Sequence, residues 1–245
     1  MNLGRLLPFF VLPAFAVGTA GAVGITYNGA GADLNVATFD SSGDVIQGVT
    51  ILTVQGTDPY LVAPGDSVQV SLTGLQYPYA GDLQVNLSLE DSLGNVLMSG
   101  DAFNQIGAFN PGDPGYDTQF GNSSSIPSGN YVFDSSFTSD LWNTAAALGS
   151  SDSIPNGNYW PTTALSDTND NLSAFFAGLP VNDKWVLTIY DDYPPFNGGI
   201  EEFVPSLTAW SVTVQAETVA AEPSTAMPVV LCGGLLWVIR RRRTA

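Results

Sequence analysis

The sequence predicts an all-β protein, built as an antiparallel β-sandwich. Turn-forming residues are frequent, with 26 glycines and 16 prolines among 245 residues. Short runs of alternating apolar and polar residues lie between the turns, and long apolar patterns of helical period are missing. Alternation with a period of two is typical of half-buried strands, and several such runs separated by turns are typical of a sandwich.

Residues 1–22 predict a secretory signal peptide. Arg5 precedes an apolar stretch at 6–17, and the small residues Ala20, Gly21 and Ala22 follow it. This order of a basic residue, an apolar segment and a small-residue cleavage pattern is typical of export signals. We therefore expect a mature start at Val23. The alternative is a first core strand or helix.

Residues 23–66 are expected to form an N-terminal β extension, with a run at 45–54 interrupted by Gly48 and a turn at 64–66. The main domain is expected at 67–215 and begins with two alternating strands on either side of a turn at 81–82. The residues predicted to face the core are Val68, Val70 and Leu72 in the first strand, and Leu83, Val85, Leu87 and Leu89 in the second.

A hairpin turn is expected at 92–95, with a returning strand at 96–98. Residues 99–130 are rich in Gly, Pro, Asn and Ser, so we expect long loops there. The heptapeptide 125–131 is echoed at 153–159, but a single echo does not indicate a repeat protein. Residues 139–148 are expected to form one or two helical turns.

The clearest strand pattern lies at 184–191, where Trp185, Leu187 and Ile189 share one face. A loop at 192–205 leads to the last strand, and a linker at 216–221 follows. The residues expected to be buried in that last strand are Leu207, Ala209 or Trp210, Val212 and Val214.

The tail at 222–245 has three parts. Glu222, Pro223, Ser224 and Thr225 come first, an apolar run at 226–239 follows, and the last part contains Arg240, Arg241, Arg242 and Arg243. The run is shorter than the roughly 17–25 residues of a membrane helix, but arginine stems can extend its apolar length. We expect a short transmembrane helix with its arginines in the cytoplasm. The alternative is a buried terminal strand or helix.

This three-part tail resembles the PEP-CTERM sorting signal of Gram-negative surface proteins. It departs from the usual form because Ala221 precedes Glu222, and because Pro228 and Cys232 interrupt the apolar run. The resemblance implies that an exosortase-type membrane enzyme recognises the tail and cleaves near Glu222 and Pro223. It also implies a transient inner-membrane intermediate, followed by release to the cell envelope or the extracellular space.

Three stretches of the body together resemble the P domain (P/Homo B) of subtilisin-like proprotein convertases. They are 81–87 with Leu93 and Gly94, 157–161 with 172–178, and 185–191 with Leu207 and 210–214. The resemblance implies a jelly-roll sandwich. The last loop departs from the family, because the longer segment 192–202 stands where the family has a short Gly-Asp-x-Gly segment.

Composition excludes several functions. The acids number 23, and Lys184 is the only cation between the first acid, Asp33, and the last, Glu222. This balance argues against binding to nucleic acid or to anionic lipid, since both need Lys and Arg. The chain has no histidine, so a Ser-His-Asp triad is excluded and a serine endopeptidase label inherited through the domain would be unsupported. Cys232 is the only cysteine, which leaves no intramolecular disulfide.

Two kinds of binding site are candidates. Trp185 and Trp210 are expected in the core, whereas Trp160, Tyr193 and Phe196 suit a sugar-stacking platform. Calcium binds 6–8 oxygen ligands from flexible loops, and the acids proposed for it are Asp167, Asp170, Asp191 and Asp192. Their alternative role is that of surface acids and turn formers.

The sequence thus predicts an exported protein of the cell surface or extracellular matrix, without catalytic residues. Its expected role is structural or adhesive, with an exopolysaccharide matrix as a candidate partner. One alternative is a calcium- or carbohydrate-binding module, with Ca²⁺ as the candidate cofactor. Another is an accessory P domain that acts with a separate subtilisin-like protease.

Overall fold

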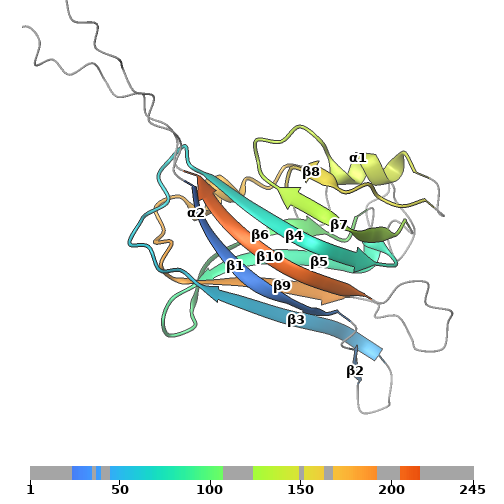
Figure 1. Ribbon diagram of the computed structural model, residues 1–245, viewed down its shortest axis with the longest axis horizontal. Coiled ribbons are helices and arrows are strands. Elements are labelled where there is room, and N and C mark those ends of the chain that lie inside the picture. The colour runs from blue at the N-terminus through green and yellow to red at the C-terminus, as the bar shows by residue number, and fades with distance from the viewer. Residues whose placement is uncertain are drawn as a thin grey trace, which may run out of the picture. The chain divides into compact units, whose positions relative to one another are not determined.

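The computed structural model describes residues 24–34, 37–39, 45–106, 124–148, 152–162, 168–191 and 205–215. They belong to one compact unit, Ala22–Glu217, and form two five-stranded sheets (Figure 1). The order in sheet A is β1 (Gly24–Asp33), β10 (Ser206–Gln215), β4 (Ser67–Tyr77), β7 (Ile126–Phe133) and β8 (Gly157–Tyr159). The order in sheet B is β2 (Ala37–Phe39), β3 (Val45–Gln55), β9 (Lys184–Asp191), β5 (Leu83–Glu90) and β6 (Val96–Asn104).

The protein is therefore all-β, as predicted. Every strand pair is antiparallel except β7 with β8, which is parallel. Three short helices accompany the sheets in the described residues: η1 (Ala80–Asp82), α1 (Leu141–Ala146) and α2 (Leu172–Phe176). The helical turns expected at 139–148 are thus confirmed as α1, where the Asp140 side chain accepts from the Trp142 N–H at 2.8 Å.

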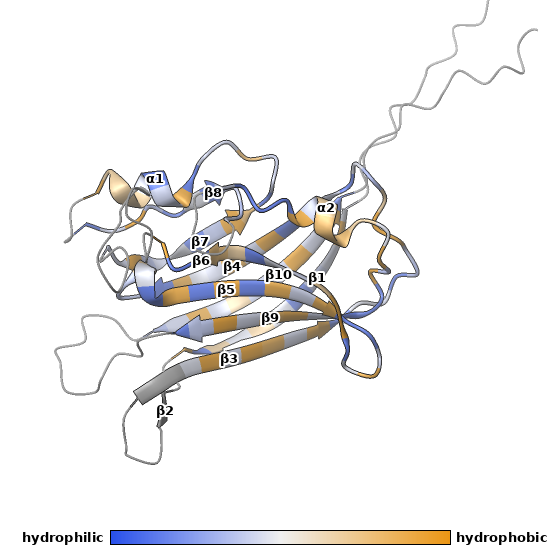
Figure 2. Cartoon of the chain, turned by 180° about the vertical axis from the view of Figure 1, so that it is seen from behind, coloured by the Kyte–Doolittle hydropathy of each residue, from blue (hydrophilic) through white to orange (hydrophobic). Residues whose placement is uncertain are grey.

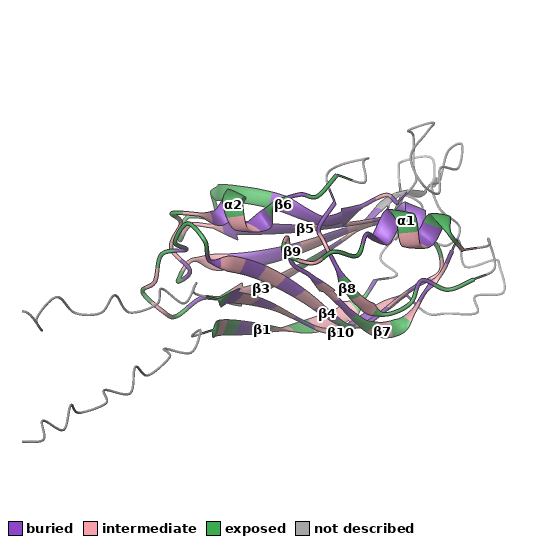
Figure 3. Ribbon diagram, turned by 90° about the horizontal axis from the view of Figure 1, so that it is seen from above, coloured by how far each residue is buried: buried purple, intermediate pink, exposed green. Residues whose placement is uncertain are grey.

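The core is a single cluster of apolar side chains contributed by both sheets. The predicted alternation is confirmed in β4, β5 and β9, where inward residues are buried and most outward residues are half-buried. Figure 2 shows the corresponding bands of hydropathy along β5 and β9, and Figure 3 shows the buried residues between the two layers. Trp185 and Trp210 are both core residues, and in β10 the buried position is Trp210 rather than Ala209.

Residues 23–66 contribute strands to both sheets. β1 pairs with β10 along its whole length, from Gly24 opposite Gln215 to Asp33 opposite Ser206. β3 pairs with β9, with Leu52 opposite Leu187. Strands on both sides of the boundary expected at residue 66 therefore belong to the same two sheets.

The loops expected throughout 99–130 are wrong at both ends of that range. β6 continues to Asn104 and β7 begins at Ile126, while 107–123 lies outside the described residues. Gly100, inside β6, lies under α2, where a Cβ would be 2.6 Å from Leu172 Cδ2 and 2.9 Å from Phe175 Cδ2. A glycine inside a strand often marks such a close approach.

The echoed heptapeptides lie side by side in sheet A. Ser125 and Ser153 form a parallel bridge, and their hydroxyl oxygens are 2.8 Å apart. In each copy the tyrosine hydroxyl donates to the proline carbonyl four residues earlier, at 3.3 Å from Tyr131 and 2.7 Å from Tyr159. The repeated sequence therefore encodes the same local turn twice, in adjacent parallel strands.

The predicted hairpin at 92–95 is confirmed. Asp91 Oδ1 accepts from the backbone N–H groups of Leu93 and Asn95 at 2.8 and 2.9 Å, and Gly94 has a φ of 84°. Hydrogen bonds from Asn95 lower the pKa of Asp91.

Among the described residues, none of the helices is long and apolar enough to cross a membrane, and the run at 226–239 lies outside them.

Candidate functional site

A cleft of about 490 Å³ opens at one end of the sandwich, where three segments far apart in sequence meet. Its walls are the turn before β4, the turn after β7 and the first residues of α2. Most lining side chains are small or carry oxygen, and none of these described residues is cationic. They are Pro64, Gly65, Asp66, Ser67, Asp134, Ser135, Ser136, Asn171, Ser173, Ala174 and Ala177.

Asp134 is the most buried acid on the β7 side of the cleft, with 3% of its surface exposed. It follows the last residue of β7, and its backbone N–H donates to the Tyr159 carbonyl at 3.1 Å. The backbone N–H and the hydroxyl of Ser136 both donate to Asp134 Oδ1, at 2.8 and 2.7 Å. Oδ2 receives no hydrogen bond from the described residues and, unlike the Ser135 hydroxyl, is not one of the oxygens fully shielded from solvent.

Ser135 provides a second oxygen with unused hydrogen-bonding capacity. Its hydroxyl is shielded from solvent and has no hydrogen-bond partner within the described chain. Its carbonyl accepts from Asn169 Nδ2 at 3.0 Å, which fixes the turn against the segment before α2. Buried polar groups are normally paired, so this hydroxyl is an exception in the wall of the cleft.

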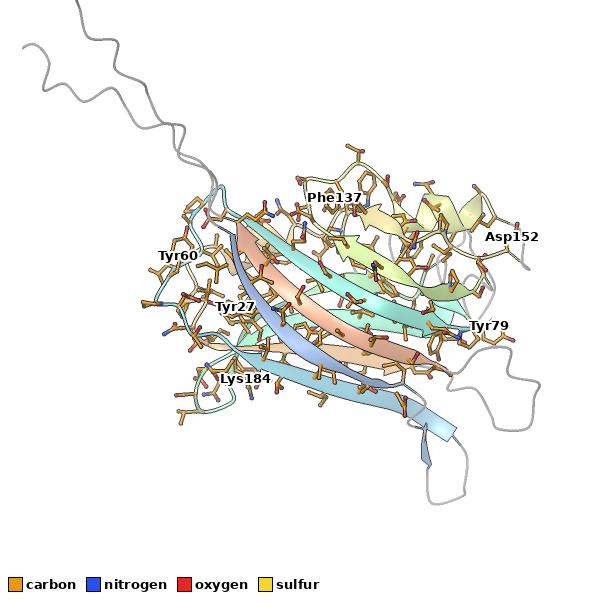
Figure 4. The ribbon with its side chains drawn as sticks, in the orientation of Figure 1. Tyr27, Tyr60, Tyr79, Phe137, Asp152 and Lys184 are labelled. Carbon is orange, nitrogen blue, oxygen red and sulfur yellow. The ribbon has the colours of Figure 1, made fainter. Side chains whose placement is uncertain are left out.

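The opposite wall is held by Asp66. Its Oδ2 accepts from the Tyr60 hydroxyl at 2.6 Å and from the Ala63 backbone N–H at 2.7 Å. The hydrogen bond to Asp66 raises the pKa of Tyr60, which lies at one end of the sandwich (Figure 4). Gly65 has a φ of 100°, so the turn predicted at 64–66 is confirmed and depends on glycine.

The third wall is α2, which packs against β4 and β6. Asn171 caps the helix because its Oδ1 accepts from the Ala174 N–H at 3.1 Å. Ser173 Oγ accepts from the Val68 backbone N–H at 3.0 Å and so joins the helix to β4. Both residues hold this wall in place.

Two of the four acids predicted for calcium, Asp170 and Asp191, lie in the described chain. Asp170 is buried and turns towards β6, where its Oδ2 accepts from the Asp101 N–H at 2.9 Å. Asp191 is buried at the end of β9, opposite Leu83 and Gly48. Asp167 and Asp192 lie outside the described residues, within which no group of three or more His, Cys, Asp or Glu residues is placed to hold a metal ion.

Of the proposed aromatic platform only Trp160 lies in the described residues, and the sorting tail lies outside them. Trp160 is half-buried rather than exposed, and its indole nitrogen is buried without a hydrogen-bond partner in the described chain. Tyr193 and Phe196 lie outside the described residues. So do the sorting residues Glu222, Pro223, Ser224 and Thr225 and the basic residues Arg240, Arg241, Arg242 and Arg243.

Sequence reasoning missed a buried polar cluster around Asp101. Its Oδ1 accepts from Asn86 Nδ2 at 2.8 Å and Gln84 Nε2 at 3.3 Å, and its Oδ2 accepts from Asn104 Nδ2 at 2.9 Å. Burial and the charge of Asp101 raise the pKa of Asp170, against the opposing effect of the Asp101 N–H. The amides at alternate positions of β5 were the available signal, but alternation alone does not reveal that a carboxylate lies between them.

Lys184, the only cation in the described residues, forms an ion pair with Glu90 Oε2 at 2.5 Å. The pair joins adjacent strands β9 and β5. The described surface thus offers no unpaired basic side chain.

Comparisons with protein-family models, with curated proteins and with solved structures found no match.

Proposed function

We propose that the chain is an exported, non-catalytic protein of the cell surface or extracellular matrix, with a structural or adhesive role. The observation that carries this proposal is the pairing of Gly24 with Gln215 at one edge of sheet A. The described body begins two residues after the predicted leader and ends just before the predicted linker. Because Gly24 and Gln215 are neighbours, a C-terminal anchor would attach the whole sandwich at one point, next to the mature N-terminus.

The finer fold we propose is a jelly roll, in agreement with the P-domain resemblance. The strand orders β1-β10-β4-β7 and β3-β9-β5-β6 support it, because the first and last strands are neighbours and the chain alternates between sheets as in paired Greek keys. A P domain could instead assist a separate subtilisin-like protease. Co-purification with such an exported protease would support that alternative role.

Exosortase-type sorting is tested by the fate of the tail. We expect the released form to lack the residues after the Glu222–Pro223 region in a host that carries the enzyme. The double variant E222A/P223A should accumulate in the inner membrane with its arginines intact. Mass spectrometry of the C-terminal peptide measures both outcomes. An intact C-terminus on the released wild-type protein would contradict the proposal.

A second candidate function is carbohydrate binding in the cleft, favoured by the Asp134 carboxylate, whose Oδ2 receives no hydrogen bond from the described chain. A sugar hydroxyl can donate to such a carboxylate oxygen. Asp66 and Asp134 are the acids in the described lining, whereas calcium binds 6–8 oxygen ligands, so a neutral polyhydroxy ligand is the first candidate and calcium the alternative to test.

The variant D134N distinguishes sugar binding from calcium binding, and it retains the Oδ1 acceptor for Ser136. After a glycan array has identified a ligand, D134N should weaken its binding by about 1–3 kcal/mol, the cost of an unsatisfied polar partner. S128A is the control, because Ser128 is exposed on β7 and does not line the cleft. A calcium-dependent rise in melting temperature that D134N abolishes would favour calcium. Equal sugar binding by D134N and S128A would exclude this cleft.

A further inference from the structure

The Asp134 carboxylate in the wall of the cleft is almost completely buried, and no cation of the described residues accompanies it. Its exposed fraction is 3%. Lys184 is the only basic residue in the described ranges, and it is already paired with Glu90. Acids are rarely this buried unless a positive charge lies beside them. The described lining therefore leaves the negative charge of Asp134 without a balancing positive charge.

The two oxygens of this carboxylate differ in what they can still bind. Oδ1 already accepts from the backbone N–H and the hydroxyl of Ser136. Oδ2 receives no hydrogen bond from the described residues, is not fully shielded from solvent, and belongs to a residue that lines the cleft. A ligand in the cleft can therefore bind one oxygen of Asp134 but not both.

This difference selects among the cationic groups that a ligand could carry. A guanidinium binds a carboxylate best through two parallel N–H donors, which requires both oxygens. A primary ammonium is a compact charge with three donors and no acceptor, so a single free oxygen suits it. A neutral hydroxyl can also donate to Oδ2, but it leaves the charge of Asp134 unbalanced.

The α2 wall offers donors, which an ammonium cannot use but a sugar ring can. Asn171 and Ser173 accept through their side-chain oxygens from the backbone N–H groups of Ala174 and Val68. Within the described residues, neither the Asn171 amide nitrogen nor the Ser173 hydroxyl donates a hydrogen bond, and both residues line the cleft. Sugar hydroxyls accept as well as donate. The volume of about 490 Å³ also lies within the roughly 300–1,000 Å³ of small-molecule sites.

We propose that the cleft binds a sugar with a free, protonated amino group, placing the ammonium on Asp134 Oδ2 and ring hydroxyls on Asn171 and Ser173. This inference rests on the carbohydrate binding proposed above for the same cleft and names the class of sugar. An ammonium fills the hydrogen-bonding position of a hydroxyl and also balances the buried charge. Charge-assisted hydrogen bonds are roughly twice as strong as neutral ones, so we expect the amino sugar to bind about tenfold more tightly than its uncharged counterpart.

Isothermal titration calorimetry of the full chain with three probes tests this preference. The first probe is a glucosamine trisaccharide. The second is its N-acetylated form, which keeps the ring hydroxyls and an N–H but has no charge. The third is a tri-lysine peptide with blocked ends, which has three ammonium groups and no ring hydroxyls. We expect the glucosamine trisaccharide to bind about tenfold more tightly than either of the others.

Two substitutions of one acid each are compared. D134N should reduce the affinity for the glucosamine trisaccharide to that of the N-acetylated form. The matched control D33N removes the same charge from an exposed residue. Asp33 lies opposite Ser206, whereas Ser67 of the cleft lies opposite Gln215 at the other end of β10, so D33N should leave the affinity unchanged.

The variant N171S keeps the test independent of any folding defect in D134N. Serine can still cap α2, but it lacks the amide donor, so N171S should weaken binding of the glucosamine trisaccharide and leave tri-lysine binding unchanged. Equal affinities for the two trisaccharides, both lost in D134N, would overturn this inference while carbohydrate binding in the cleft stands. Tri-lysine binding as tight as that of the amino sugar, or equal losses in D134N and D33N, would overturn it in favour of general attraction to an acidic surface. Binding of neither trisaccharide would also overturn it, and the glycan array would then decide the carbohydrate function alone.

Discussion

Replacement of Gly29 by alanine tests whether β1 has the register described above. Gly29 lies opposite Trp210 in the β1–β10 pair. A Cβ at this position would overlap Nε1 and Cε2 of the Trp210 indole and would lie 2.8 Å from its Cδ1. Trp210 is 1% exposed, so its ring has no free space into which it can move. Overpacking of this kind lowers the free energy of unfolding by about 1–3 kcal/mol.

The control is the same substitution at Gly24 in the same strand, where a Cβ would have ordinary contacts of 3.7 Å with Gln215 and Thr213. We expect G24A to change stability by less than about 0.5 kcal/mol. Urea unfolding followed by tryptophan fluorescence measures both variants. With a denaturant slope of about 1–3 kcal/mol/M, the loss in G29A should lower the urea midpoint by roughly 1 M. Equal midpoints for G29A and G24A would refute the assigned register.

Two other predictions concern buried polar groups. Y131F should lose about 1–3 kcal/mol of stability, because the Ile154 carbonyl loses the donor at 3.0 Å, whereas Y79F, at a half-exposed site, should change little. The raised pKa of Asp170 means that acidification protonates this group in the folded protein before the unfolded chain. Wild type should therefore gain stability relative to D170N as the pH falls towards 3.8, and a difference between them that does not vary with pH in urea titrations would contradict this reasoning.

The strands that the sequence predicted well have one face buried against the opposite sheet. In β4, β5 and β9 the inward residues are apolar and the outward residues are mostly polar, so the period of two is visible without any tertiary information. In β10 the pattern left Ala209 and Trp210 as alternatives. Only the packing of the two sheets decides between them, and it buries Trp210.

The strands that were missed contain residues that locally favour turns. Gly100 allows α2 to approach β6, and Gly129 lies where a Cβ would be 2.8 Å from the Asn156 side chain. Both glycines are required by contacts with residues distant in sequence, which an inspection of neighbouring residues cannot reveal. The cleft was missed for the same reason, because its walls come from residues 64–67, 134–136 and 171–177.

The pairing of β1 with β10 also sets the order in which the sandwich can assemble. β1 is the first described strand and β10 the last, so β1 has no neighbour in sheet A until almost the whole body has emerged. Non-local pairings of this kind make folding slow, since the entropy of a long loop is lost before any contact compensates for it. Between emergence and completion, β1 would remain a strand without a partner, and a chain truncated before residue 206 could never close its first sheet.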